Sequence, residues 1–535
     1  MRMMTAVALL AAGSVVFAGE SFLVRVDRSF APDPAGLAGE GFEVVAELEE
    51  ATLVRAGVAE LDRLEAEFGA VVLDRDPESR LYLYAMPRGG FPPARLAEFG
   101  RVLFEDAGNV LLATSEDRVL EMNRLPVELA RIRMRPLVFD RLDGGPPPLP
   151  AVGDSLVWDL VGAVSQDSVL GTIQRLEDFV TRYSTHDSCF AAVEWVRARF
   201  EEYGCDTTYL FPFRNGYAPN AVGIRRGTVN PQRIYVIGGH TDATSNQVPN
   251  RCPGSDDNAS GTTAVLEAAR VFQGVEFENT VMFIGFAGEE QGLYGSDSFA
   301  EFCHRRGDSI KAMLNFDMIS YGRESRDSLD VIGKSSNPAC GWLVDHYIAQ
   351  ADTFTTLKTK RSVSSYIQPN SDHYSFIARG YPALMGIERD FTPKYHTIGD
   401  TIGPLYYVNC GTNNWPMATE ATRAAVASIA KLAGAYQPTG VEESPARGPA
   451  RITGVEPAIG RGPFVLRLSR PAGPAARLEV FDATGRSVRE LAAAGLRSVT
   501  WDGTDGGGLA LAPGIYLLRL ADGAGSATAK AVLSF

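Results

Sequence analysis

One segment of the sequence reads Tyr235-Val-Ile-Gly-Gly-His-Thr-Asp242, an apolar run that ends in polar residues. This apolar run spans residues 233–238, and three more short apolar runs occupy residues 280–287, 312–316 and 383–387. Helical patterns at 262–272 and 418–432 accompany them. Runs of this kind are typical of buried strands, and their alternation with helices is typical of an α/β sheet covered on both faces. We therefore predict an α/β domain over residues 155–437.

Residues with acid–base or metal-binding chemistry follow several of these runs. They are His240 and Asp242 after the first run, Glu289 and Glu290 after the second, Asp317 after the third, and His396 in a separate loop at 394–397. In open α/β sheets, functional groups gather at the carboxyl ends of the strands. We therefore expect these side chains to meet at one edge of the sheet.

Five polar residues form a candidate set of metal ligands: His240, Asp257, Glu290, Asp317 and His396. Two imidazoles and three carboxylates can hold a pair of divalent ions if one carboxylate bridges them. Nitrogen and oxygen ligands suit zinc, and ligand type alone also admits manganese or cobalt. Glu289 then remains as a free base beside the metals, and Asp242 is placed to orient the imidazole of His240. This pattern predicts metal-assisted hydrolysis.

Five motifs resemble, in order and spacing, those of the secreted bacterial di-zinc aminopeptidases, which are family twenty-eight of the metallopeptidases. The motifs are His240-Thr-Asp242, Gly254-Ser-Asp-Asp-Asn-Ala-Ser-Gly261, Ala287-Gly-Glu-Glu-Gln-Gly-Leu-Tyr-Gly-Ser296, Asn315-Phe-Asp317 and Tyr395-His-Thr397. The resemblance covers residues 155–437. It implies a mixed, mostly parallel sheet of the phosphorylase/hydrolase-like type flanked by helices, two Zn²⁺ ions per chain, and removal of N-terminal residues from peptides or proteins.

The resemblance also assigns a role to each residue that matches a motif. Asp257, the fourth residue of Gly-x-x-Asp, would bridge the two ions, and its bond to Asn258 is often cis in this family. His240 and Asp317 would bind one zinc, whereas Glu290 and His396 would bind the other. Glu289 would be the general acid and base.

A further motif, Ser371-Asp-His373, resembles one that lines the substrate side in the family, so His373 is a candidate active-site residue. Many relatives add a tyrosine shortly before this motif that stabilises the tetrahedral oxyanion. Tyr366 is the candidate for that role here, although Gln368 stands closer to the expected place. A purely structural role for Tyr366 is the alternative.

The N-terminal part of the chain predicts export. Residues 1–18 combine Arg2, an apolar stretch and small residues before a cleavage point, as in a signal peptide. Residues 19–150 mix strand and helix patterns, carry no histidine and end in a Pro-rich linker at 143–150. We expect an α+β domain, either a pro-segment that assists folding or covers the site, or a docking domain that stays attached.

The C-terminal part, residues 446–535, has short alternating strands separated by Gly- and Asp-rich turns, which favours a small β-sandwich. Its segments Val480-Phe-Asp-Ala-Thr-Gly-Arg486, Val499-Thr-Trp-Asp-Gly503, Pro513-Gly-Ile-Tyr516 and Lys530-Ala-Val-Leu533 resemble Ig-like tail domains of exported bacterial proteins, some of which are sorting signals. The resemblance implies contact with secretion machinery or attachment to the cell surface, and a simple spacer is the alternative. Trp501 and Tyr516 are expected in its core.

Composition excludes some functions and leaves others open. A net charge of −14 argues against a nucleic-acid partner, and after the signal no apolar run is long enough to span a membrane. Six cysteines in an exported chain invite disulfides, but a helix between Cys189 and Cys205 would hold these two about 24 Å apart, too far to pair. The alternatives to an aminopeptidase are a carboxypeptidase, a glutaminyl-cyclase-like enzyme, or a non-catalytic receptor or adhesion module on the same fold.

Overall fold

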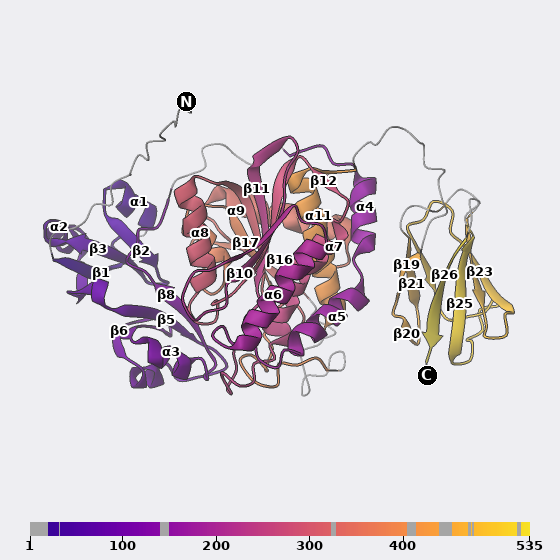
Figure 1. The fold of residues 1–535 in the computed structure, drawn as a ribbon, viewed down its shortest axis with the longest axis horizontal. Helices are drawn as coiled ribbons and strands as arrows, with labels where there is room; N and C mark the ends of the chain where they lie inside the picture. The colour runs from indigo at the N-terminus through magenta and orange to yellow at the C-terminus, as the bar shows by residue number, and fades with distance from the viewer. Residues whose placement is uncertain are drawn as a thin grey trace, which may run out of the picture.

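The computed structural model describes residues 20–31, 33–139, 149–322, 328–403, 414–437, 452–468, 472, 476–521 and 526–534. An N-terminal region, a central α/β region and a C-terminal β region follow one another along the long axis of the molecule (Figure 1). The expected signal peptide lies outside the described residues, as does most of the expected linker at 143–150. Within the described ranges, no helix is long and apolar enough to cross a membrane.

The N-terminal region contains two antiparallel sheets with strand orders β2-β3-β1-β4 and β6-β7-β5-β8. The strands are β1 (Ser21–Asp27), β2 (Glu43–Glu47), β3 (Ala51–Gly57), β4 (Val71–Asp74), β5 (Leu81–Pro87), β6 (Arg101–Asp106), β7 (Asn109–Thr114) and β8 (Val127–Ile132). The helices are α1 (Pro34–Gly39), α2 (Val58–Phe68) and α3 (Glu116–Met122). One hydrophobic core, which includes Leu23, Leu53 and Tyr84, draws on both sheets, so the region packs as one unit.

The central sheet has eight strands in the order β16-β15-β17-β14-β11-β13-β10-β9. They are β9 (Thr207–Phe211), β10 (Asn220–Arg225), β11 (Asn230–His240), β13 (Asn279–Phe286), β14 (Ser309–Phe316), β15 (Leu329–Lys334), β16 (Thr359–Ser364) and β17 (Ala383–Glu388). The pairs β13–β11, β11–β14, β14–β17 and β15–β16 are parallel. The pairs β9–β10, β10–β13 and β15–β17 are antiparallel. The predicted mixed, mostly parallel sheet is therefore confirmed, and its four predicted strands are β11, β13, β14 and β17.

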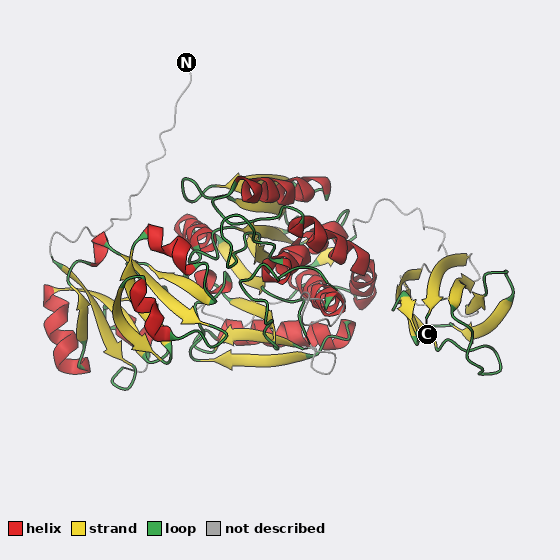
Figure 2. Ribbon diagram, turned by 90° about the horizontal axis from the view of Figure 1, so that it is seen from below, coloured by secondary structure: helices red, strands yellow, loops and turns green. Residues whose placement is uncertain are grey.

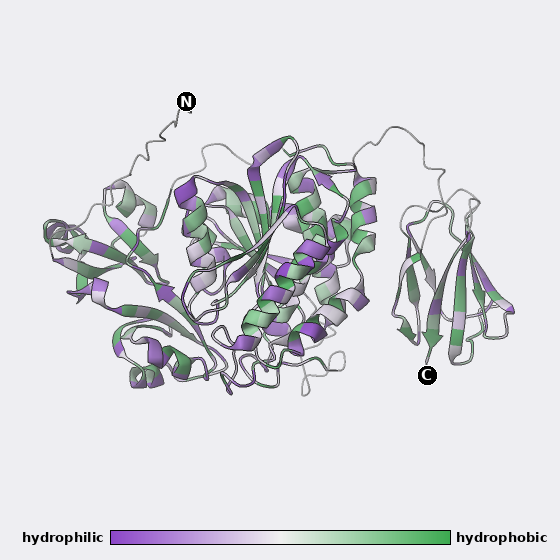
Figure 3. Ribbon diagram, viewed as in Figure 1, coloured by the Kyte–Doolittle hydropathy of each residue, from purple (hydrophilic) through white to green (hydrophobic). Residues whose placement is uncertain are grey.

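Helices cover both faces of this sheet (Figure 2). They are α4 (Asp154–Ala163), α5 (Gln166–Glu177), α6 (Asp187–Glu202), α7 (Gly261–Val271), α8 (Tyr294–Arg306), α9 (Pro338–Phe354), α10 (His373–Ile377) and α11 (Trp415–Ala433). Successive side chains of a strand point to opposite faces. Accordingly Tyr235 and Ile237 join the core under α6, α7 and α11, whereas Val236 joins the core under α8 and α10. The central strands are coloured mainly as hydrophobic in Figure 3, as expected for a sheet buried on both faces.

The described C-terminal residues form two sheets, β19-β21-β24 and β20-β26-β25-β22-β23. Their neighbouring strands are antiparallel except for the parallel pair β20–β26. The strands are β19 (Ile452–Glu456), β20 (Ile459–Gly460), β21 (Phe464–Leu468), β22 (Arg477–Phe481), β23 (Ser487–Ala492), β24 (Ser498–Trp501), β25 (Gly514–Ala521) and β26 (Ser526–Leu533). Trp501 stacks on Phe464 with ring centroids 5.3 Å apart, and Tyr516 packs edge-on against Trp501 with ring centroids 5.2 Å apart. Both Trp501 and Tyr516 are buried, so their predicted core positions are confirmed.

The five cysteines in the described part of the chain are free: Cys189, Cys205, Cys252, Cys303 and Cys340. The expectation that Cys189 and Cys205 do not pair agrees with this finding, whereas disulfides among these five do not form. Four of them are buried, and Cys205 is partly buried. They act as small apolar side chains in the packing.

Candidate metal centre

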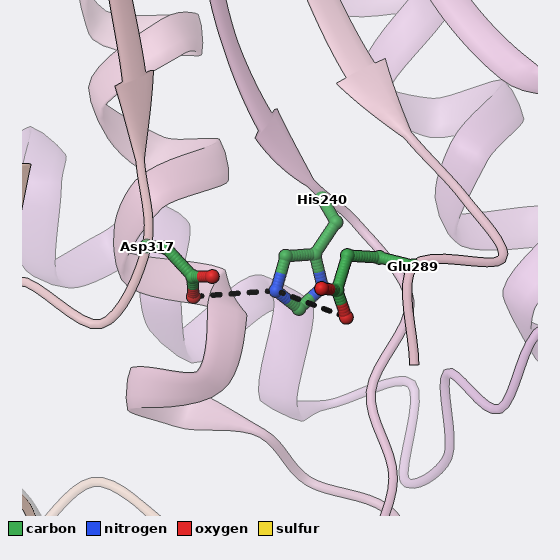
Figure 4. Close-up of side chains that lie close together, drawn as sticks. All are labelled: His240, Glu289 and Asp317. Carbon is green, nitrogen blue, oxygen red and sulfur yellow. Dashed lines mark hydrogen bonds and ion pairs between the residues drawn. The ribbon is translucent and has the colours of Figure 1, made fainter. Parts of the chain in front are cut away.

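The carboxyl ends of three neighbouring parallel strands place the candidate ligands together. Strand β11 lies between β13 and β14 and ends at His240. Asp317 follows β14, and the loop after β13 carries Glu289 and Glu290. Figure 4 shows His240 between Asp317 and Glu289, with Nε2 of the imidazole 3.3 Å from Asp317 Oδ1 and 3.9 Å from Glu289 Oε2. The predicted convergence at one sheet edge is therefore present.

Asp257 lies between the two imidazoles. Its Oδ1 is 3.4 Å from His240 Nε2, and its Oδ2 is 3.3 Å from His396 Nε2. Glu290 Oε2 completes this side at 3.1 Å from His396 Nε2. The peptide bond between Asp257 and Asn258 is cis, as the resemblance implied. Asp257 thus faces both halves of the group, which is the position a bridging ligand needs.

Two sets of residues could each hold a metal ion, because the potential donor atoms within each set lie within 4.8 Å of one another. The first set is His240, Glu289 and Asp317, and the second is His240, Asp257 and Glu290. The first set includes Glu289, which was predicted to be a base rather than a ligand. Its contact with His240 Nε2, at 3.9 Å, is the longest of the three that carboxylates make with that nitrogen, the others being 3.4 and 3.3 Å. His396 joins the second set through its contacts with Asp257 and Glu290.

The buried charges of the candidate ligands would be stabilised by bound cations. Burial raises the pKa of Asp257 well above its usual range and Glu290 raises it further, while both imidazoles oppose this. Burial lowers the pKa of His396, but Glu290 and Asp257 outweigh burial and raise this pKa to about 10. A cluster of buried carboxylates that holds its imidazoles protonated lacks positive charge. The donors are imidazole nitrogens and carboxylate oxygens, which are ligands of zinc. The residues therefore fit the expected metal.

Asp242 supports the group from behind, as predicted for a residue that orients His240. Its Oδ1 lies 3.7 Å from His240 Nδ1, and its backbone oxygen lies 3.1 Å from the same nitrogen. The carboxylate also accepts hydrogen bonds from the backbone N–H groups of Glu289 and Glu290, at 3.4 and 3.3 Å. One buried carboxylate therefore links the first ligand to the loop with the two glutamates.

Sequence reasoning missed three buried residues that hold these loops. Ser184 donates its hydroxyl to Asp242 Oδ2 at 2.6 Å. Arg182 donates to backbone carbonyls around His240 and Asp257, and Asp400 accepts from the backbone of Asp256 and Asp257. None belongs to a motif with metal-binding chemistry. They lie 58 to 144 residues from these partners, so no local pattern identifies them.

His373 is fully buried at the start of α10, close enough to Asp317 for each charge to affect the other. Burial lowers the pKa of His373 to about 4, although Asp317 opposes this. The imidazole is therefore neutral at pH 7. Neither ring nitrogen has a hydrogen-bond partner in the described structure. The structure thus brings His373 beside the ligand group, as a polar side chain with both nitrogens unused.

Tyr366 is not brought into the ligand group. The guanidinium of Arg28 lies 5.7 Å from its ring centroid, and its hydroxyl is close to Tyr84. Burial raises the pKa of Tyr366, and the neighbouring Tyr84 and Asp106 raise it further. All three neighbours belong to the N-terminal region. These neighbours are those expected of a structural tyrosine, and the oxyanion role of Tyr366 stays a prediction.

Gln368 instead reaches a pair of charged residues from the N-terminal region. Its Oε1 accepts from Arg88 Nη2 at 2.8 Å, and the same Arg88 nitrogen lies 2.7 Å from Glu128 Oε2. Burial raises the pKa of Glu128, Arg88 opposes this, and Asp317 and His396 act on it as well. The carboxylate of Glu128 therefore lies near the ligand group.

Asn123 makes the closest link between the N-terminal region and the site. It is fully buried and donates its amide to the backbone oxygen of Glu290 at 2.6 Å. Its own backbone oxygen accepts from Thr244 Oγ1 at 3.1 Å, and its Oδ1 accepts from Tyr183 at 3.2 Å. Through Asn123 the N-terminal region therefore contacts the loop that carries Glu290.

Comparisons with known proteins identify two families. The model of peptidase family M28 matches residues 220–417, and the model of the FlgD Ig-like domain matches residues 456–526. A protein of Arthroderma otae named "Probable leucine aminopeptidase" is 30% identical over 264 residues, which are 46% of this chain and 70% of that protein. A "Probable zinc metalloprotease" of Pyrenophora tritici-repentis is 24% identical over 310 residues, covering 47% of this chain and 70% of its own. The LapA aminopeptidase structure of Legionella pneumophila has a TM-score of 0.47 at 20% identity and covers 77% of this chain and 98% of its own.

Proposed function

The chain belongs to peptidase family M28 as a zinc metallo-aminopeptidase, and from this premise we propose that it is an exported enzyme that uses two zinc ions to remove N-terminal residues from peptides or proteins. In this proposal His240 and Asp317 would hold one ion, Glu290 and His396 would hold the other, and Asp257 would serve both. The observation that carries the proposal is that the two oxygens of Asp257 face two different imidazoles, at 3.4 and 3.3 Å.

The chain's own residues supply orientation and proton transfer. Zinc ions bound here would activate a water molecule and polarise the scissile carbonyl. Glu289 takes the proton of the attacking water and delivers it to the leaving amine. Its support is its place 3.9 Å from His240 Nε2, where burial raises the pKa of Glu289 well above the usual range although His240 opposes this. Asp242 keeps the imidazole of His240 directed at the site.

The test of the aminopeptidase assignment is a comparison of two substrate classes. Amino-acid anilides with a free amine should be cleaved, and peptides with a blocked N-terminus should not. Cleavage of only the blocked peptides would assign the site to another class, such as a carboxypeptidase. Zinc content measured on the same sample should approach two ions per chain, because both ligand sets are intact.

We further propose that residues 19–150 are a pro-segment that covers the site. The support is the position of Asn123 on the backbone of Glu290 and of Glu128 near Asp317 and His396. A docking domain would have no need to reach the ligands. Comparison of the chain before and after limited proteolysis in the 143–150 linker tests this role. A rise in activity on removal supports it.

Export and sorting complete the proposal. Residues 1–18 are proposed as a cleaved signal peptide, and the Ig-like region at 446–535 as the part that contacts secretion machinery or attaches to the cell surface. The support is the sequence pattern of the first region and the FlgD Ig-like match of the second. Mass spectrometry of the protein recovered outside the cell should give a mature N-terminus after Ala18. A chain without residues 446–535 should lose surface attachment.

A further inference from the structure

We propose that Arg182 and Asp400 are positioning residues that brace the segment 253–257 from its two ends and thereby set the place of Asp257 between the imidazoles. The inference rests on the proposed di-zinc function. The side-chain hydrogen bonds described for the two residues go to backbone groups. Both act on the backbone of the segment that carries the bridging ligand.

Arg182 holds the first end of the segment. Its guanidinium is fully buried and donates to the carbonyl oxygens of Pro253 and, at 2.7 Å, Gly254. It also donates to the carbonyl oxygen of Thr241 at 2.7 Å, next to His240, and to that of Leu176 at 3.0 Å. One cation thus ties the loop before Asp257 to the loop after His240.

Asp400 holds the second end. Its Oδ1 accepts from the backbone N–H of Asp256 at 2.9 Å, and its Oδ2 accepts from that of Asp257 at 3.0 Å. Its backbone oxygen accepts from Ser255 at 3.1 Å. Asp400 also belongs to the loop that carries His396, since its own N–H donates to Thr397. The loop that supplies one ligand therefore also holds the bridging ligand.

The two charges match the polarity of the groups that they hold. The cation takes two consecutive carbonyls, and the anion takes two consecutive N–H groups, so every backbone group they reach has a charged partner. Charge-assisted hydrogen bonds are stronger than neutral ones, and a buried backbone group left without a partner is costly. The segment needs this support because it is irregular: Asp257 and Asn258 have non-helical backbone angles.

Gly254 shows how closely the segment is enclosed. Its φ is +53°, and a Cβ there would lie 2.8 Å from Arg182 Nη2 and 2.5 Å from the Cβ of Ala243. Ser255 adds a side-chain contact, since its hydroxyl donates to Glu177 Oε2 at 2.6 Å. The segment therefore has little room to adjust when the hydrogen bonds at one end are removed. We expect the resulting displacement to extend along the segment to Asp257.

The test is the zinc affinity of the variants D400N and R182K, measured by equilibrium dialysis against a chelator. D400N keeps the size of the side chain but turns an N–H donor toward a backbone N–H. R182K keeps the charge but cannot reach four carbonyls. Each should weaken zinc binding about 10–100-fold, as changes behind metal ligands do, with thermal unfolding still cooperative. The turnover number should fall while KM changes little.

Two controls and a double variant make the outcome specific. Asp345→Asn removes an exposed carboxylate on α9, and Arg225→Lys alters a buried arginine that donates to the carbonyl of Tyr203, so neither should alter zinc affinity. The double variant should lose less than the product of the single losses, because both act on one segment. Unchanged zinc affinity in D400N and in R182K overturns the brace alone. A wild-type chain that binds no zinc overturns the proposed function and the brace together.

Discussion

The carboxylate of Asp257 faces His240 with one oxygen and His396 with the other, at 3.4 and 3.3 Å from their Nε2 atoms. These two histidines are 156 positions apart in the sequence, one at the end of β11 and one in a loop after β17. A single side chain thus joins the two halves of the candidate site.

Replacing Asp257 by Asn should remove the bridge. We expect zinc content to fall from about two ions to one or fewer per chain, and activity to fall about 1000-fold or more, since one ligand serves both ions. Zinc is measured by elemental analysis after dialysis against metal-free buffer. Asp345→Asn is the matched control because that carboxylate is exposed and pairs only with Arg361 among the contacts described. Two ions retained in D257N would contradict the bridging role.

Replacing Glu289 by Gln should separate proton transfer from metal binding. The turnover number should fall about 100–10,000-fold, the usual contribution of a general acid or base, while zinc content stays at the wild-type value. Rates with an amino-acid anilide and zinc content on the same sample measure both. Glu290→Gln is the comparison, and it should lose zinc because Glu290 faces His396 at 3.1 Å. Full activity in E289Q would leave Glu289 without its assigned role.

Loosening the N-terminal cover should raise the activity of the full-length chain. Asn123→Ala removes the bond to the backbone of Glu290, and Glu128→Gln weakens the pair with Arg88. We expect each variant to cleave the anilide several-fold faster. The substitution removes a contact made only when the N-terminal region covers the site, so the equilibrium shifts toward the uncovered state. Glu121→Gln on the exposed side of α3 is the control and should change nothing. Rates equal to wild type in N123A, E128Q and the proteolysed chain would argue for an open site.

His346 should make stability depend on pH away from the metal centre. It lies buried on α9 with Nε2 3.4 Å from the carbonyl oxygen of Ser428, and burial lowers its pKa from 6.5 to about 4. A folded-state pKa below the unfolded value means that the stability present above pH 6.5 is lost as pH falls toward 4. The loss between pH 7 and pH 5 should be about 2 kcal/mol.

The variant His346→Gln isolates this effect, because glutamine stays neutral and can still donate to Ser428. The difference in free energy of unfolding between wild type and H346Q, measured in urea at pH 7 and pH 5, should change by the stated amount in favour of the variant at pH 5. A difference that is the same at both pH values would show that His346 does not titrate in this range.

The α/β class of the central region, four of its strands, the candidate ligands and two core residues of the Ig-like region could be predicted from sequence because each depends on short-range patterns. The apolar runs around Tyr235 and Phe283 are typical of buried strands, which is what the structure shows, and polar residues after parallel strands meet at one edge. Trp501 in an alternating strand points inward for the same kind of reason. The spacing of residues along the chain was enough for these inferences.

The partners of Tyr366, Gln368 and Asn123, and the support from Arg182, Ser184 and Asp400, became visible only in the folded chain. The hydrogen bonds among them join residues 58 to 280 positions apart, and their energies come from burial and from charge on backbone groups, which no local periodicity records. The five scattered ligands of the sequence are therefore a list of chemical types. The fold makes them one site, because parallel strands fix three of them and a braced irregular segment places Asp257 between the two imidazoles.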